Sequence, residues 1–165
     1  MVRVDVAGIM MADGPVPSVI ILRERKCSSA PCRTLSIKTG AIEAKAIAQG
    51  LYHEEPQRPI THDLLASTIG ALGAIVRRVV IARMDRPVFY ANVVLASKGS
   101  SEETFLDARP SDAIALAART GAPIFVEDDV MNRAGSTNKA EDEGALEQEY
   151  VQFDEFVQHL SPNDF

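Results

Sequence analysis

The feature that most restricts the fold of this chain is a partial internal repeat. Asp112 lies 69 residues after Glu43, and this shift superimposes EAKAIA (Glu43–Ala48) on DAIALA (Asp112–Ala117). Strand-like segments ahead of the two copies also coincide, with PSVII opposite RPVFY. Each half therefore indicates three strands followed by a helix. We predict an internal duplication of a β-β-β-α unit, in which Glu43 and Asp112 occupy equivalent positions.

Residue periodicity predicts the individual elements. Val- and Ile-rich segments bounded by turn residues predict strands at 2–11, 17–24, 33–38, 76–84, 88–97, 103–108 and 123–126. Apolar spacing predicts helices that begin near residues 40, 61 and 110. Thr61 is the expected N-cap of the second helix and Gly73 its expected end. This helix has a stripe that we expect to be buried: Leu64, Leu65, Thr68, Ile69 and Leu72.

The composition changes after Arg133. Residues 133–149 include almost no large apolar side chain, so we predict a flexible acidic linker there. Residues 150–165 have an apolar stripe at helical spacing, formed by Phe153, Phe156, Val157 and Leu160. We therefore expect a globular domain at 1–132, the linker at 133–149 and a C-terminal amphipathic helix at 150–165.

The net charge of −6 argues against a nucleic-acid partner, but the charge is unevenly distributed. Residues 141–165 contain eight Asp or Glu and no Lys or Arg, so residues 1–140 hold 17 basic and 15 acidic side chains. Basic residues gather in RERK (Arg23–Lys26) with Arg33, and again at Arg77, Arg78, Arg83 and Arg86. These clusters indicate either solvated strand edges, which we favour slightly, or a phosphate-binding surface.

The sequence has neither a membrane-spanning segment nor a secretory signal, so we expect a cytoplasmic protein. Its two cysteines, Cys27 and Cys32, bound the loop CSSAPC, and no His lies near enough in sequence to complete a metal site. Two plain thiols in a reducing compartment are therefore expected. A zinc half-site or a redox pair is the alternative.

The segment LDARPSDAIALAAR (Leu106–Arg119) places charges at the start of an alanine-rich helix. Pro110 suits the first helical position, and Asp112 falls in the first turn, where a carboxylate favours the positive end of the helix dipole. The alanines let the helix approach its sheet closely. Folding does not explain why Asp107 and Arg109 flank the same helix start.

A second charged cluster precedes another helix in RPITHD, which contains Arg58, His62 and Asp63. If the two helix starts converge, the combined residues suit phosphodiester hydrolysis. Carboxylates can hold a divalent cation, arginines can bind phosphate, and His62 can transfer a proton near neutral pH. The alternative for each residue is structural, as a helix-cap acid or a loop-fixing ion pair, with Glu43 as a candidate partner of a loop arginine.

At these residues the sequence resembles the bifunctional nuclease domain family. The matching blocks are RTLSIKTGAIEAKAIA, RPITHDLL, FYANVVL, LDARPSDAIALAAR and PIFVEDDV, within residues 1–132. Ser36, Lys38 and Thr39 depart from the usual family pattern. The resemblance implies an α+β fold with a strongly bent, mostly antiparallel mixed sheet and packed helices. It also implies a tendency to dimerise and the nuclease activity on DNA and RNA ascribed to plant members.

We therefore expect a nuclease, a hydrolase of DNA or RNA with little sequence preference. The catalytic candidates are His62, Asp63, Asp107 and Asp112. The substrate-binding candidates are Arg58, Arg109 and Ser111. The expected cofactor is Mg²⁺ or a similar divalent cation, with Asp107 and Asp112 as ligands. The expected partners are nucleic acid and a second copy of the chain, without a membrane. The alternative function is a non-catalytic dimeric binding or regulatory module that uses the same charged cleft.

Overall fold

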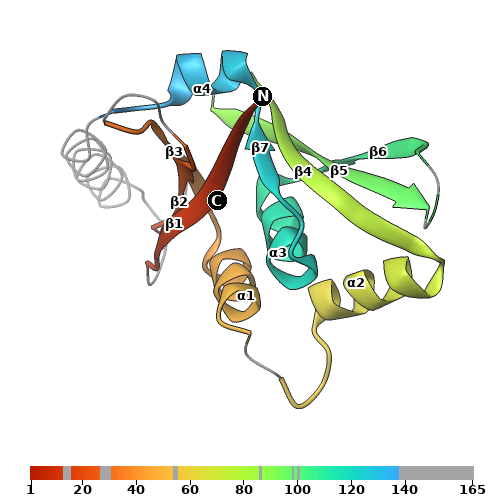
Figure 1. Ribbon diagram of the computed structural model, residues 1–165. Helices are drawn as coiled ribbons and strands as arrows, with labels where there is room; N and C mark the ends of the chain where they lie inside the picture. Colours follow the sequence, from red (N-terminus) through yellow and green to blue (C-terminus); the bar gives the residue numbers. More distant parts are fainter. Residues whose placement is uncertain are drawn as a thin grey trace, which may run out of the picture.

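The computed structural model describes residues 1–12, 16–26, 31–53, 56–85, 87–97, 99 and 101–137 of the 165-residue chain. In these ranges, seven strands form one open mixed sheet and four helices pack against it (Figure 1). The predicted C-terminal helix at 150–165 lies outside the described residues, as does the predicted linker from residue 138 onward.

The two halves of the chain have the same order of elements. The first contains β1 (Val2–Met10), β2 (Ser18–Glu24), β3 (Thr34–Thr39) and α1 (Ala41–Leu51). After α2 (Thr61–Ala71) come β4 (Ala74–Asp85), β5 (Val88–Ser97), β6 (Glu103–Ala108) and α3 (Pro110–Thr120). The chain continues with β7 (Ile124–Val126) and α4 (Asp128–Ala134). Two successive β-β-β-α units are thus present, whereas their origin by duplication stays a prediction.

The sheet has the strand order β3-β2-β1-β7-β4-β5-β6. Neighbouring strands are antiparallel except β4 and β7, which are parallel. The register shifts once in β1, between Val6 and Gly8, and twice in β4. Such bulges increase strand twist and bending, and Figure 1 shows the sheet curving around α3. These observations confirm the α+β class and the mostly antiparallel mixed sheet.

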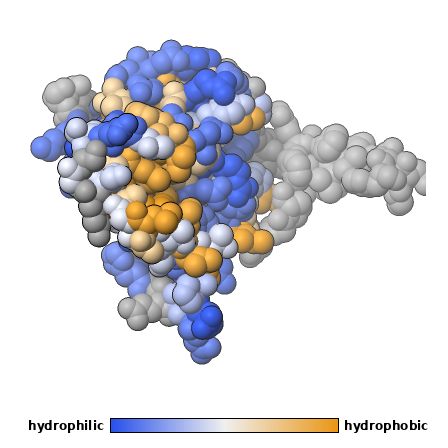
Figure 2. Space-filling model, turned by 90° about the vertical axis from the view of Figure 1, so that its right-hand side faces the viewer, coloured by the Kyte–Doolittle hydropathy of each residue, from blue (hydrophilic) through white to orange (hydrophobic). Residues whose placement is uncertain are grey.

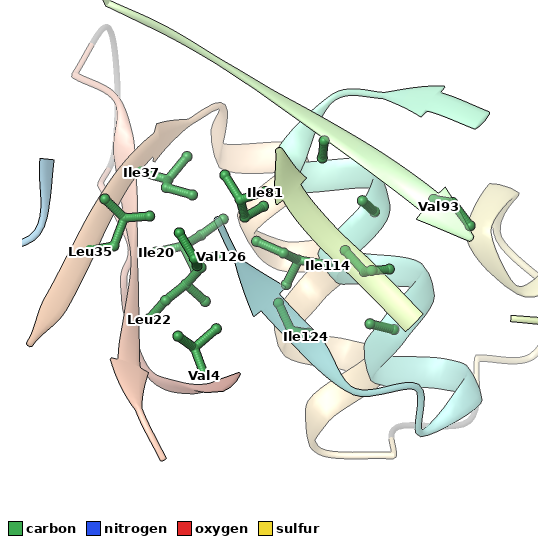
Figure 3. Close-up of a cluster of buried hydrophobic side chains, with 14 of the residues drawn as sticks. Val4, Ile20, Leu22, Leu35, Ile37, Ile81, Val93, Ile114, Ile124 and Val126 are labelled. Atoms are coloured by element: carbon green, nitrogen blue, oxygen red, sulfur yellow. The ribbon is translucent and has the colours of Figure 1, made fainter. Parts of the chain in front are cut away.

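The hydrophobic core lies between the sheet and α3. Every side chain from Ala113 to Ala117 is buried. Figure 3 shows Ile114 of α3 among aliphatic side chains from strands of both halves, including Leu22 of β2 and Ile81 of β4. The alanines on α3 let this helix lie close to the sheet, as the sequence predicted, and the helix also packs against α1.

The N-terminus of α2 differs from the prediction that Thr61 is the N-cap. The helix begins at Thr61, and Ile60 is the N-cap residue. Ile60 has no side-chain cap hydrogen bond, but the carboxylate of Asp63, at the third helical position, accepts a hydrogen bond from the Ile60 N–H at 2.9 Å, as the acidic residue of a capping box does. The end of the helix agrees with the prediction, since Gly73 follows it with φ of 74°.

The prediction of a buried stripe on α2 is wrong, because Ile69 is the only buried residue of this helix. The helix packs mainly against α3 and β4 at one side of the molecule. Leu64 and Leu72 are 62% and 79% exposed. Figure 2, in which this side faces the viewer, shows hydrophobic surface spread across it. The apolar residues at helical spacing on α2 therefore include exposed side chains as well as the buried Ile69.

Cys32 is disulfide-bonded, so the expectation of two plain thiols is wrong for this residue. Cys27 lies outside the described residues. In the part of the chain that the structure describes, none of the helices has the length and apolar character needed to cross a membrane.

Candidate active site

Three helices begin with the same arrangement of charge. Glu43 in α1, Asp63 in α2 and Asp112 in α3 each occupy the first turn, three residues after the N-cap. A carboxylate there offsets the positive end of the helix dipole. His62 of α2 contacts Asp112, and Arg109 connects Glu43 with Asp112. The structure therefore brings together the helix starts that contain His62, Arg109 and Asp112.

His62 and Asp112 form a hydrogen-bonded pair, with His62 Nε2 3.2 Å from Asp112 Oδ1. Hydrogen bonds from Arg109 lower the pKa of Asp112 against the opposing effect of burial, and His62 lowers it further. An ionised carboxylate only accepts hydrogen bonds, so Nε2 carries the shared proton. In the neutral ring, Nδ1 then carries the lone pair, and it has no hydrogen-bond partner among the described residues. The contact with Asp112 therefore orients His62 so that Nδ1 is the nitrogen available to accept a proton.

Arg109 links α3 to α1. Its Nε and Nη2 donate to the two carboxylate oxygens of Asp112 at 2.8 and 3.2 Å, and its Nη1 donates to Glu43 Oε1 at 3.0 Å. A guanidinium has five N–H groups, so two remain for a ligand. The Arg109 side chain is 65% exposed, so these groups are accessible. Glu43 is the partner of a loop arginine, as one of the sequence-based alternatives stated.

Two cavities meet at the ion pair of Glu43 and Arg109. An open groove of about 470 Å³ runs between α1 and the starts of α2 and α3, where His62 and Asp112 contribute to its wall. A second cavity, of about 510 Å³, lies between β3 and the start of α3. Glu43 and Arg109 line both. The residues with acid–base and phosphate-binding chemistry therefore border open space.

Asp63 does not line the groove and belongs to a structural network. Its carboxylate accepts hydrogen bonds from Arg119 and from the Ile60 N–H. Burial raises the pKa of Asp63, but these two hydrogen bonds together lower it below its ordinary value. Arg119, whose side chain is only 9% exposed, also donates to the carbonyl oxygens of Ala46 and Ala115 at 2.9 Å. Arg119 thus ties α1, α2 and α3 together.

Sequence reasoning missed this role of Arg119. The available signal was weak, since a basic residue in the last turn of a helix is common for dipole reasons alone.

The remaining candidates, Asp107, Arg58 and Ser111, form no hydrogen bond or ion pair with the cluster among the described residues. Asp107 on β6 is opposite Asn92 of β5, and its neighbour Ala108 packs against the core. Because side chains alternate along a strand, Asp107 is directed to the sheet face opposite the helices. Arg58 is exposed and forms no hydrogen bond or ion pair with another described residue. Ser111 is 8% exposed and lines the second cavity.

The described ranges contain no group of three or more His, Cys, Asp or Glu side chains that could hold a metal ion. The alternation of β6 directs Asp107 to the sheet face opposite α3, which carries Asp112, so the two expected ligands do not point toward each other. Both carboxylate oxygens of Asp112 already accept hydrogen bonds from Arg109. This donor set does not fit a resident divalent cation, and the metal requirement stays a prediction.

Five arginines of the basic clusters form ion pairs with neighbouring carboxylates. The pairs are Arg25–Asp5, Arg33–Glu24, Arg77–Glu103, Arg78–Glu103 and Arg83–Asp85. Arg86 lies outside the described residues. This pairing favours charged strand edges over a phosphate-binding surface.

Comparison with known proteins adds independent evidence. The sequence model of a family described as "Bifunctional nuclease domain" matches residues 20–139. An uncharacterized protein of Mycobacterium tuberculosis is 36% identical over 168 residues, which covers 99% of this chain and 97% of that protein. A protein of Oryza sativa subsp. indica named "Bifunctional nuclease 1" is 39% identical over 70 residues, which covers 42% of this chain and 21% of that protein. The chain belongs to the bifunctional nuclease domain family.

Proposed function

We propose that the protein is a nuclease that hydrolyses phosphodiester bonds of DNA or RNA in the groove between α1, α2 and α3. The observation that carries the proposal is the series of contacts from Glu43 through Arg109 and Asp112 to His62 beside that groove. Membership of the family supports a nuclease-related function. The name of the rice relative supports nucleic acid as the substrate.

In the proposed reaction, water attacks the phosphorus atom and the P–O bond to the leaving alkoxide breaks. Nδ1 of His62 accepts the proton of the attacking water, and Asp112 stabilises the resulting imidazolium. The two free N–H groups of Arg109 bind non-bridging phosphate oxygens and offset the charge that develops in the transition state. The leaving alkoxide takes its proton from solvent.

The other candidate carboxylates have no direct part in this reaction. Asp63 supports the site by fixing α2 to α3 through Arg119. The alternation of β6 directs Asp107 to the other face of the sheet, and Asp107 is not among the residues that line the groove. We therefore assign the catalytic function to His62 and Asp112, with Arg109 as the phosphate-binding residue.

The direct test is cleavage of fluorescein-labelled single-stranded DNA and RNA oligonucleotides. Wild-type protein should cleave both, and His62→Ala protein purified in parallel should not, which excludes a contaminating nuclease. Equal cleavage by the two preparations would overturn the assignment. Each reaction is repeated with EDTA, with and without excess Mg²⁺. Loss of cleavage that Mg²⁺ restores would support the predicted metal requirement, and unchanged cleavage would remove it.

A non-catalytic binding or regulatory module is the second candidate function. It is favoured by the mutual pairing of Glu43, Arg109 and Asp112, which also suits a purely structural network. In that case an oligonucleotide, or another ligand, should bind without being cleaved.

We also propose that the protein forms a homodimer. The support is a set of exposed apolar side chains: Leu64 and Leu65 on α2, Leu72 directly after it, and Phe105 and Leu106 on β6. β6 is the last strand of the sheet in the described part of the chain, and an open strand edge favours pairing with another chain. Sedimentation should give a dimer mass for wild type and a monomer mass for Leu72→Arg combined with Phe105→Arg. A wild-type monomer at micromolar concentration would contradict the proposal.

A further inference from the structure

A third cavity lies at the end of the sheet away from the proposed active-site groove. It has a volume of about 550 Å³, and its lining residues lie at the start of β1, at the end of β2, just before β3 and at the start of α4. Figure 1 shows α4 and the start of β1 at one end of the sheet and α1 at the other. Among the described residues, this cavity shares none with the groove. It is therefore separate from the proposed active site.

The lining of this cavity has an excess of positive charge. Its charged side chains are four basic residues and two acidic ones: Arg3, Arg25, Lys26, Arg33, Glu24 and Asp128. These side chains together have a net charge of +2. Glu24 pairs with Arg33, and the N-terminal ammonium group of Met1 pairs with Asp128. Both carboxylates are thus already offset, so they repel an incoming anion less.

Two of the basic side chains have no acidic partner in the described part of the chain. Arg3 and Lys26 are exposed and form no ion pair with another described residue, whereas Arg25 pairs with Asp5. Opposite charges attract over about 10 Å at 0.1 M salt, so these two side chains attract an acidic segment that comes near. The expected occupant of the cavity is therefore a run of carboxylates.

The described part of the chain passes this cavity shortly before it ends at residue 137. Ser136 and Thr34 exchange two backbone hydrogen bonds, at 2.7 and 2.8 Å, and their pairing is antiparallel. The chain after Ser136 therefore runs toward the start of β3, where Arg33 lines the cavity, and away from Thr39 and α1. The segment that follows thus starts beside the basic cavity.

This following segment has the opposite charge. EDEGALEQE (Glu141–Glu149) contains five Asp or Glu and no Lys or Arg, and Lys139 is the one basic residue between Ser136 and this segment. Glu141 is five residues after Ser136, so it can lie at most about 18 Å away. So short a connection keeps the effective concentration of the segment on the order of millimolar. A weak electrostatic attraction is then sufficient for docking.

We propose that the acidic segment Glu141–Glu149 docks on this basic cavity of the same chain. Its carboxylates pair with Arg3 and Lys26, the two basic side chains without an acidic partner among the described residues. A nucleic-acid strand has the same sign of charge, but it lacks the covalent connection at Ser136 that brings the segment to the cavity. The docked segment lies away from the groove that contains His62 and leaves that groove open, so the proposal does not rest on the proposed function.

Cross-linking of the full-length protein with a water-soluble carbodiimide tests the contact. This reagent joins a lysine amine to a carboxylate that touches it. Mass spectrometry of proteolytic peptides should find Lys26 joined to Glu141–Glu149 at low salt, and 1 M NaCl should reduce the yield because the Debye length falls to about 3 Å. Lys45 is the matched control, since it is also exposed but lines the active-site groove. No product at Lys26, or an equal yield at Lys45, would overturn the proposal.

Charge-reversal variants connect this contact to the cavity. Arg3→Glu should lower the initial rate of cross-linking at Lys26 at least about twofold, because it turns an attraction into a repulsion. Arg58→Glu makes the same change of net charge at an exposed side chain outside the cavity and should leave the rate unchanged. Equal effects of the two variants would show an attraction by overall charge alone and would overturn the assignment to this cavity.

A second measurement requires no cross-link. A full-length variant replaces the first three acidic residues of the segment by their amides: Glu141→Gln, Asp142→Asn and Glu143→Gln. Lys26 of this variant should react faster with an acetylating ester than in the wild type, because the segment no longer covers it. Lys45 should react at its wild-type rate. An unchanged rate at Lys26 would contradict docking at the cavity.

The cross-linking experiment also identifies other occupants. Isotope-labelled and unlabelled protein are mixed in equal amounts before the reaction. Products whose two peptides have the same label support docking within one chain, whereas mixed products would place the segment on a second copy and overturn the proposal. An equimolar single-stranded oligonucleotide should leave the product at Lys26 unchanged, and loss of the product would assign the cavity to phosphate groups instead. None of these measurements uses cleavage, so docking and the nuclease proposal can fail separately.

Discussion

Asp63→Asn and Asp112→Asn remove the same charge from the same position of neighbouring helices, yet we expect opposite consequences. The partner of Asp63 is Arg119, whose side chain is 9% exposed. Breaking a buried ion pair costs about 3–5 kcal/mol. Because Asp63 itself is 26% exposed and partly screened by water, we expect a loss of about 2–3 kcal/mol for Asp63→Asn.

The corresponding loss for Asp112→Asn is smaller. Asp112 is 35% exposed and its partner Arg109 is 65% exposed, so solvent screening limits the pair to about 0.5–1 kcal/mol. One kcal/mol shifts the Tm of a domain of this size by about 2–4 °C. Asp63→Asn should therefore lower the Tm by about 4–12 °C and Asp112→Asn by at most about 4 °C.

Activity should follow the reverse order. An amide at position 112 can donate to Nε2 of His62 and favour the tautomer that lacks a lone pair on Nδ1, so cleavage should fall on the order of a hundredfold or more. Asp63→Asn should keep most of its activity at temperatures well below its Tm. Calorimetry and the rate of oligonucleotide cleavage measure the two effects. If Asp112→Asn proves the less stable variant, or Asp63→Asn is inactive while fully folded, the division of roles is wrong.

Three further predictions follow from the helix packing and the charges. Gly50→Ala should destabilise the protein by about 1–2 kcal/mol, because the new Cβ would lie 2.8 Å from Arg119 Nη1 and 2.9 Å from the Ala118 Cβ. A Cβ added at Gly70 of α2 would meet no atom within 4 Å, so Gly70→Ala should stabilise the protein by about 0.5–1 kcal/mol. Equal changes of the unfolding free energy in urea for Gly50→Ala and Gly70→Ala would contradict the close packing of α1 on α3. Arg119 lowers the pKa of Asp63, and Arg109 lowers the pKa of Asp112. The two ionised carboxylates therefore stabilise the fold at pH values above their ordinary pKa, and this stabilisation should be lost as the pH falls through their lowered pKa values. Urea midpoints that stay constant from about pH 5 to 2 would refute this. Arg109→Lys keeps the charge but loses the paired N–H geometry, so KM for an oligonucleotide should rise about tenfold with little change in Tm, and an unchanged KM would exclude Arg109 as the phosphate-binding residue.

Local sequence patterns predicted most of the fold. The Val- and Ile-rich strands, the alanine-rich α3 and the glycine end of α2 depend on neighbouring residues, and each is found close to its expected range. The exposure of α2 depends instead on its place in the tertiary structure. Apolar spacing marks Leu64 and Leu72 as one face of a helix, but it cannot show whether the chain itself or another molecule covers that face.

The sequence predicted those residues of the candidate site that lie at the N-terminus of a helix. His62, Arg109 and Asp112 lie together because each is at or near the start of a helix whose N-terminus points to the same groove. Asp107 is only two residues from Arg109 in sequence, but the alternation of β6 places its side chain on the other sheet face. Asp63 and His62 are adjacent, yet the turn of α2 directs Asp63 to the buried Arg119. These differences of direction come from strand pairing and helix packing over long sequence separations.

Chemical rescue of His62→Ala tests the central claim most directly. His62 is 12% exposed at the wall of the groove, so its removal leaves a space that opens to solvent and can admit imidazole. If His62 is the proton acceptor, cleavage by the variant should be lost and should return in proportion to added imidazole, while Asp112→Asn combined with His62→Ala should not be rescued. Wild-type cleavage rates in the variant without imidazole, or a folded variant that no concentration of imidazole reactivates, would contradict the account.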